Sequence, residues 1–315
     1  MRRTGRTPFR LLLIALVVAL GSVLTSTASA SNLIDRNARN VRLKVNKAGI
    51  AMLTYSKRST GRRVYHVLAR GAINARRPVK GTKQVEFKLD YTGGWGYFRN
   101  ADWWKHFKNV CGPYEGPELA WFTTACTMPN GSSWAVQTWQ RELANYGLKS
   151  TGLHKSWEMR LSHWNTELPV LTINLDWSYA GRFDHLWGFY TYRGKPVYGF
   201  TQTPQGAPLD RFGRNVYVDT YNSLYGKGWK RENAFLTHPP TGGFCYGFSQ
   251  KTAAMRASGI TGKGTKYRAT VQGPGVTPDV FWQGDALGPY DNALDAQLNE
   301  QQTVELKGDA RCHIN

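Results

Sequence analysis

The stretch Leu171-Thr-Ile-Asn-Leu-Asp-Trp177 has a large apolar residue at every second position and a polar residue between each pair. Because successive side chains of an extended strand point to opposite faces, this period of two predicts a β-strand with one apolar face. The same alternation returns at 85–91, 157–161, 216–219 and 267–271, with Gly- and Pro-bearing turns between the runs. Many short strands with frequent turns predict a mainly β protein with an antiparallel sandwich or jelly-roll-like core.

A basic β-meander is predicted at the N-terminal end of this core. Three apolar runs between residues 41 and 69 are separated by basic, Gly-bearing turns, and the alternation at 85–91 would add a last strand. The segment 74–83 carries adjacent arginines and a proline and is the candidate linker. We therefore expect a meander at 31–82, as a unit of its own or as part of a main β-sandwich domain at 83–315.

Helical spacing occurs in two places. Trp103, Phe107 and Val110 are three or four residues apart, which predicts a small helical insert near 100–126. The segment 289–307 has the same apolar spacing and is followed by a glycine, which predicts a C-terminal helix.

The first thirty residues have the order of a secretory signal peptide. Four arginines among residues 1–10 precede the apolar run Leu11–Leu20, and Ala28-Ser29-Ala30 follows. This order predicts cleavage after Ala30 and a secreted, extracellular product that begins at Ser31. No later segment reaches 18 apolar residues, so no transmembrane segment is expected after the signal is removed.

Four cysteines in an exported chain predict two disulfides. The short separation favours Cys111–Cys126, which would staple the helical insert and leave Cys245 to pair with Cys312. No C-x2-C pair is present, and the sequence predicts neither a metal site nor a cofactor.

The positive charge is concentrated near the N-terminus. The chain has 41 Lys and Arg against 21 Asp and Glu, and removal of the four signal-peptide arginines lowers the net charge from +20 to +16. Residues 31–100 contribute 16 basic and three acidic residues. Such a field favours a polysaccharide or anionic cell-envelope polymer as partner, although solubility alone would also explain it. No sequence motif predicts specific nucleic-acid binding.

The residues that alternate with the apolar ones are expected to face solvent and form the candidate site. Flat rings stack on sugar faces, while carboxylate, amide and guanidinium groups bind hydroxyl and acidic groups. The predicted face comprises Glu158, Arg160, Trp164, Asn174, Asp176, Tyr217 and Asp219, with Arg211, Arg214, Lys227 and Lys230 at its rim.

The same alternation predicts whether individual tryptophan and histidine residues are buried or exposed. Trp157 is expected on a core face, and His163 and His185 are expected to be core histidines. His238, which precedes two prolines, is more open to a functional role. The tryptophans considered as candidates for exposure are Trp164, Trp187 and Trp229.

Three functions fit these features. The preferred one is non-catalytic binding of an extracellular or cell-envelope polysaccharide, most consistent with an acidic one. An alternative is a glycoside hydrolase whose Glu158 and Asp176 oppose each other about 5 Å apart on a hairpin, or a uronate lyase with Tyr221 or Tyr225 as base. A third is a structural envelope or adhesion protein whose basic segment docks on an anionic polymer.

Overall fold

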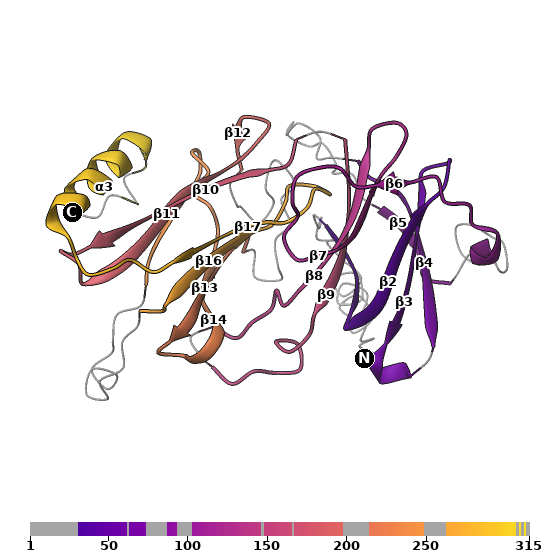
Figure 1. The fold of residues 1–315 in the computed structure, drawn as a ribbon, viewed down its shortest axis with the longest axis horizontal. Helices are drawn as coiled ribbons and strands as arrows, with labels where there is room; N and C mark the ends of the chain where they lie inside the picture. The colour runs from indigo at the N-terminus through magenta and orange to yellow at the C-terminus, as the bar shows by residue number, and fades with distance from the viewer. Residues whose placement is uncertain are drawn as a thin grey trace, which may run out of the picture.

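The computed structural model describes residues 31–61, 63–73, 87–92, 103–145, 148–165, 167–197, 214–248, 263–306, 309 and 312. Its strands form four antiparallel sheets, which pack as two sandwiches (Figure 1). The meander lies toward one end of the molecule and the C-terminal helix toward the other (Figure 1). The mainly β fold class is therefore confirmed.

The predicted N-terminal meander is confirmed as a four-stranded sheet in the order β2-β3-β4-β5, called here the meander sheet. Its register places Leu53 opposite both Leu43 and Val67. The bounds of its strands are β2 (Ala38–Val45), β3 (Ile50–Lys57), β4 (Val64–Gly71) and β5 (Phe87–Asp90).

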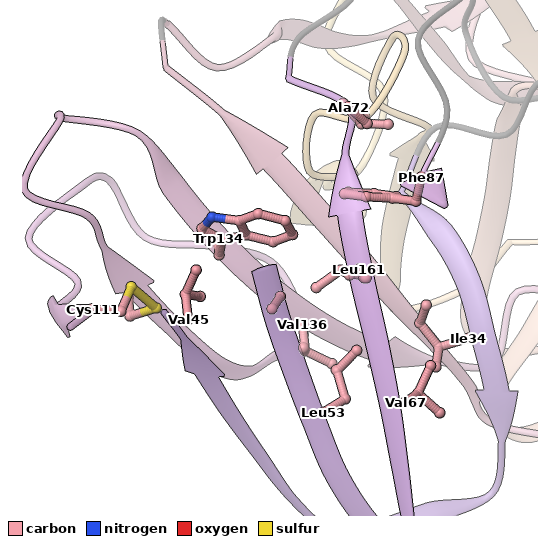
Figure 2. Packing of buried hydrophobic residues seen from close by; sticks show 14 of the residues in the cluster. Ile34, Val45, Leu53, Val67, Ala72, Phe87, Cys111, Trp134, Val136 and Leu161 are labelled. Carbon is pink, nitrogen blue, oxygen red and sulfur yellow. A yellow bond between two sulfur atoms is a disulfide. The ribbon is translucent and has the colours of Figure 1, made fainter. Parts of the chain in front are cut away.

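A second sheet, called here the central sheet, packs against the meander sheet. It has the order β1-β9-β8-β7-β6. Leu53 and Val67 from the meander share one buried cluster with Val136 and Leu161 from the central sheet (Figure 2). The meander therefore shares its core with the next part of the chain, and the expected boundary at 82/83 lies outside the described residues. The bounds are β1 (Asn32–Arg36), β6 (Gly112–Pro113), β7 (Phe122–Thr127), β8 (Ser133–Trp139) and β9 (Glu158–Trp164).

The second sandwich has its own core. One sheet has the order β10-β11-β12, with β15 also paired to β11. The other, called here the β13 sheet, has the order β14-β13-β16-β17. Leu186, Tyr190, Val218, Phe244 and Ala269 are among the residues buried between them. The bounds are β10 (Val170–Ser178), β11 (Phe183–Tyr192), β12 (Lys195–Pro196), β13 (Val216–Ser223), β14 (Gly226–Phe235), β15 (Gly243–Gly247), β16 (Lys266–Val271) and β17 (Val280–Asp285).

The predicted helices have different outcomes. The C-terminal helix is confirmed as α3 (Asn292–Glu305), and the Asp291 side chain caps it by accepting from the N–H groups of Ala293 and Leu294. The predicted helical insert near 100–126 is wrong for the described residues. They contain only the short 3-10 helix η2 (Trp103–His106), then β6 and most of β7. Trp103 and Phe107 do share a side, but they pack against the meander sheet.

Both predicted disulfides are confirmed. Cys111 bonds to Cys126 in β7, and Cys245 in β15 bonds to Cys312 beyond α3. Each bond lies within one sandwich. Among the described residues, no helix is long and apolar enough to cross a membrane.

Candidate functional site

The polar face predicted on β9 is present, but it is buried. Glu158, Arg160 and Trp164 are only 2%, 4% and 3% exposed. The central sheet is covered on both faces, because the segment between β16 and β17 packs on the side away from the meander. There the backbone carbonyl of Asp279 accepts from Gln137 Nε2 at 2.8 Å. The expectation of a solvent-facing set on β9 is therefore wrong.

The expected hairpin between Glu158 and Asp176 is also wrong. Strand β9 pairs with β1 and β8, whereas β10 pairs with β11. Arg36 and Arg160 bind the Glu158 carboxylate at 2.9 and 2.8 Å. His185 Nδ1 lies 2.6 Å from Asp176 Oδ1, in a site where both residues are buried. Each carboxylate thus has a structural environment of its own.

The residues of the predicted face that lie on its third strand, β13, are buried as well. Tyr217 and Asp219 are both 0% exposed. Asp219 accepts hydrogen bonds from Arg231 and Arg268. Burial alone would raise the pKa of Asp219, but the two guanidinium groups outweigh it and hold the pKa below its usual value. The guanidinium of Arg141 donates to the Tyr217 hydroxyl at 3.1 Å. These groups fix the boundary between the sandwiches.

The remaining predicted residues are dispersed. Asn174 and Tyr221 are half-buried, on β10 and β13, and Lys227 is exposed at the start of β14. Lys230 and Arg214 are half-buried, and Arg214 lies 3.9 Å from Glu142. Arg211 lies outside the described residues.

The histidines divide into two groups. His185 is buried as expected, and half-buried His163 stacks on Trp134 with ring centroids 3.7 Å apart. His238 lies beside Cys245 and Cys312. Within the described part of the chain, these three residues form the group whose potential metal-ligand atoms lie close together. Those cysteines are bonded to each other, so their thiolates cannot serve as ligands. His238 Nδ1 instead lies 3.1 Å from Asp309 Oδ2.

An open groove of about 660 Å³ lies on the first sandwich, where the start of β2, the 3-10 helix η1 (Arg58–Thr60) and the residue before β9 meet. Trp157 is 46% exposed at this groove, so its expected place in the core is wrong. The reason is that Trp157 precedes the first paired residue of β9. The lining residues are Asn37, Ala38, Arg39, Arg58, Ser59, Thr138 and Trp157.

The groove is cationic. Arg39 and Arg58 are exposed, and the lining residues include no carboxylate. Neither arginine has an ion-pair partner among the described residues, whereas nearby Lys57 binds Asp35 at 2.7 Å. An accessible indole beside two guanidinium groups can stack on a flat apolar ring face and bind carboxylate or sulfate groups. The sequence signal for this groove is the basic turn at 57–63, which carries one lysine and three arginines.

No protein-family model, curated protein or solved structure matches the chain. The fold and the groove together define a disulfide-bonded protein of two β-sandwiches with a cationic groove that exposes one tryptophan.

Proposed function

We propose that this protein is exported and binds an acidic polysaccharide of the extracellular space or cell envelope without cleaving it. The observation that carries this proposal is the joint exposure of Trp157, Arg39 and Arg58 in one groove. A pyranose ring has an apolar face that stacks on indole. Its uronate or sulfate groups are bound by guanidinium through paired N–H donors.

The charge distribution supports an acidic ligand. Residues 31–100 have a large basic excess, and both the groove arginines belong to this part of the chain. A positive field raises the local concentration of an anionic polymer and speeds its association. It also predicts that binding weakens as salt is added, because exposed charges are screened over about 10 Å at 0.1 M salt.

The composition of the groove supports binding over hydrolysis. Retaining and inverting glycosidases generally need two carboxyl groups beside the scissile bond. The groove lining has none, and Glu158 and Asp176 are buried in separate sheets. Tyr221, the base of the lyase alternative, lies on the second sandwich.

The two disulfides support export. Such bonds form and persist in oxidising compartments, which agrees with the signal peptide expected at residues 1–30. The basic groove also suits a structural protein that is held at the cell envelope. In that case the groove would bind an anionic polymer that is itself part of the envelope.

The test is affinity electrophoresis of the protein through gels containing polygalacturonate, hyaluronan or neutral dextran. We expect retardation by the acidic polymers, loss of retardation with salt, and no shortening of the polymer. Trp157→Ala and Arg58→Gln should each weaken binding about tenfold, equivalent to about 1.4 kcal/mol. Trp104→Ala, which removes another exposed tryptophan, is the control. Equal retardation of Trp157→Ala and the parent protein would reject the groove, and a shortened polymer would indicate an enzyme.

A further inference from the structure

The outer face of the β13 sheet carries a row of aromatic and cationic side chains. Tyr221 in β13 lies opposite Trp229 in β14, and their ring centroids are 5.2 Å apart. The Arg268 guanidinium, from β16, lies 4.4 Å from the Trp229 ring centroid. It also lies 5.6 Å from the ring of Trp121, which comes from the first sandwich. The exposed ring of Phe281 is 5.1 Å from Trp121.

These five residues, called here the aromatic row, lie on the face of the β13 sheet that does not form the core. Val218 and Ala269, which oppose each other across β13 and β16, point into the second sandwich. Residues one position further along each strand point the other way. The same face carries Tyr217, which is 0% exposed and clusters with Trp139 of the first sandwich. The row therefore lies where this face emerges from the boundary between the sandwiches, and Phe281 is 43% exposed there.

A buried carboxylate fixes the centre of the row. Asp219 is 0% exposed and accepts from Nε of Arg268 at 3.0 Å and from its Nη2. Arg231 binds the same carboxylate from the neighbouring strand. Nη1 of Arg268 is not used by Asp219. Because one carboxylate serves two guanidinium groups, a positive charge remains between the rings. A charged donor held in place by a sheet is suited to ligand binding, because little side-chain entropy is lost.

Trp121 is also held in place. Its backbone has a φ of 46°, a left-handed conformation that is costly for an aromatic residue. Its ring stacks on buried Trp139 at 4.5 Å, with 7° between the planes. Packing therefore holds a strained residue so that its ring meets Arg268. Strain of this kind is concentrated at binding and active sites.

We infer that the aromatic row is a second subsite for the same acidic polysaccharide. This inference rests on the proposed function. Half-buried Trp229 and exposed Phe281 would stack on sugar rings, with Arg268 between them to bind an acidic group. Exposed Gln283, directly opposite Arg268 in the register, adds a donor and acceptor for hydroxyl groups.

Two subsites change how the protein binds a polymer. The groove belongs to the first sandwich and the row lies mainly on the second. A chain long enough to reach both gains from effective concentration, and two separate chains can be bridged. A short oligosaccharide can occupy each subsite but gains nothing from the other. The inference therefore predicts two sites for short ligands and a strong dependence of affinity on chain length.

The test uses isothermal titration with tetragalacturonate and with polygalacturonate, and turbidity to detect bridging. The variants are Trp157→Ala, Trp229→Ala and both together, with Trp104→Ala as control. Phe281→Ala changes the row at an exposed position, so it reports on the subsite if Trp229→Ala unfolds the β13 sheet. Circular dichroism establishes that each variant is folded.

We expect two tetragalacturonate sites in the parent protein and one in each single variant. Affinity for the polymer should fall at least tenfold in each single variant, and turbidity should disappear. Loss of binding by Trp157→Ala alone, with Trp229→Ala and Phe281→Ala unchanged, would overturn the second subsite and keep the proposed function. Absence of binding to either ligand by the parent protein would overturn both.

Discussion

Asn37 and Trp157 hold each other through two hydrogen bonds. The Asn37 N–H donates to the Trp157 carbonyl at 2.8 Å, and the Trp157 N–H donates to Asn37 Oδ1 at 3.0 Å. Asn37 achieves this with a left-handed backbone, at a φ of 58°. Asparagine tolerates this conformation better than most residues. The pair positions the exposed indole at the edge of the groove.

Asn37→Ala is therefore expected to lower the free energy of unfolding by about 2 kcal/mol. About half is the loss of a hydrogen-bond acceptor and about half is backbone strain. Urea unfolding measures the change. Asn40→Ala is the matched control, because Asn40 also has a left-handed φ but its side chain donates to Ser56 at 3.4 Å, and it should cost about 1 kcal/mol. Affinity for polygalacturonate should fall only for Asn37→Ala; equal effects of both changes on affinity would contradict the positioning role.

Asp219→Asn should be strongly destabilising. Removal of the carboxylate leaves Arg231, which is 1% exposed, and Arg268 without their shared counter-charge. Breaking a buried ion pair in this way costs about 3–5 kcal/mol. Asp285→Asn is the control, since Asp285 is exposed and its 3.1 Å bridge to Lys266 should contribute under about 1 kcal/mol. Chemical denaturation of both variants measures the two losses of stability. Similar unfolding midpoints for the two variants would mean that the buried network contributes little to the free energy of unfolding.

His163 predicts a loss of stability in mild acid. Burial lowers its pKa to about 4, against the opposing effect of the Gly71 and Ala72 carbonyls. The unfolded chain has a histidine pKa of about 6.5, so it binds a proton first as the pH falls. The stability that neutral His163 contributes to the folded state is therefore fully present above about pH 6.5 and is lost as the pH falls toward 4.

His163→Gln should flatten this part of the stability profile, measured by urea unfolding between pH 7 and pH 4. His66, whose pKa is also lowered by burial, accounts for part of the slope that remains. His106, which is exposed at the end of η2, provides the control substitution His106→Gln. If both variants kept the parent slope, the assignment to His163 would be wrong.

The N-terminal residue of the expected product supplies a further prediction. Ser31 is 0% exposed; its hydroxyl donates to Asp279 at 3.1 Å and its carbonyl accepts from Arg160 at 2.8 Å. A chain that starts at Ser31 carries an ammonium group close to the Asp279 carboxylate, whereas a longer chain carries a neutral peptide bond. We expect a chain with a short N-terminal tag to melt several degrees lower. Differential scanning calorimetry of the two forms measures this, with a C-terminal tag as control; equal melting temperatures would reject the role of the terminus.

Periodicity in the sequence was sufficient to predict β9, β10, β13, β16 and the meander, because alternation is a local property. It could not predict burial of both faces of β9. Glu158 and Arg160 are covered by a segment more than a hundred residues further along the chain, and their polar character indicated solvent. In the same way, the helical spacing of Trp103 and Phe107 reflects packing on the meander and not a continuous helix.

For the proposed binding site, the sequence predicted the types of residue but not their positions. Tryptophan beside arginine was the expected chemistry, yet Trp164 is buried and Trp157 is exposed. The difference depends on where β9 begins to pair, which is decided by β1 and β8. Trp229 and Tyr221 were both named as candidates, and their contact follows from the β13–β14 register.

The burial of Ser31 has a consequence for the processing that the proposed export would involve. Residues 31–36 lead into the same buried network that links the central sheet to Asp279. Removal of the signal peptide after Ala30 would create the ammonium group that this network can accept. In the exported protein that we propose, cleavage would therefore place a new positive charge inside the contacts that join β1, the central sheet and the segment before β17.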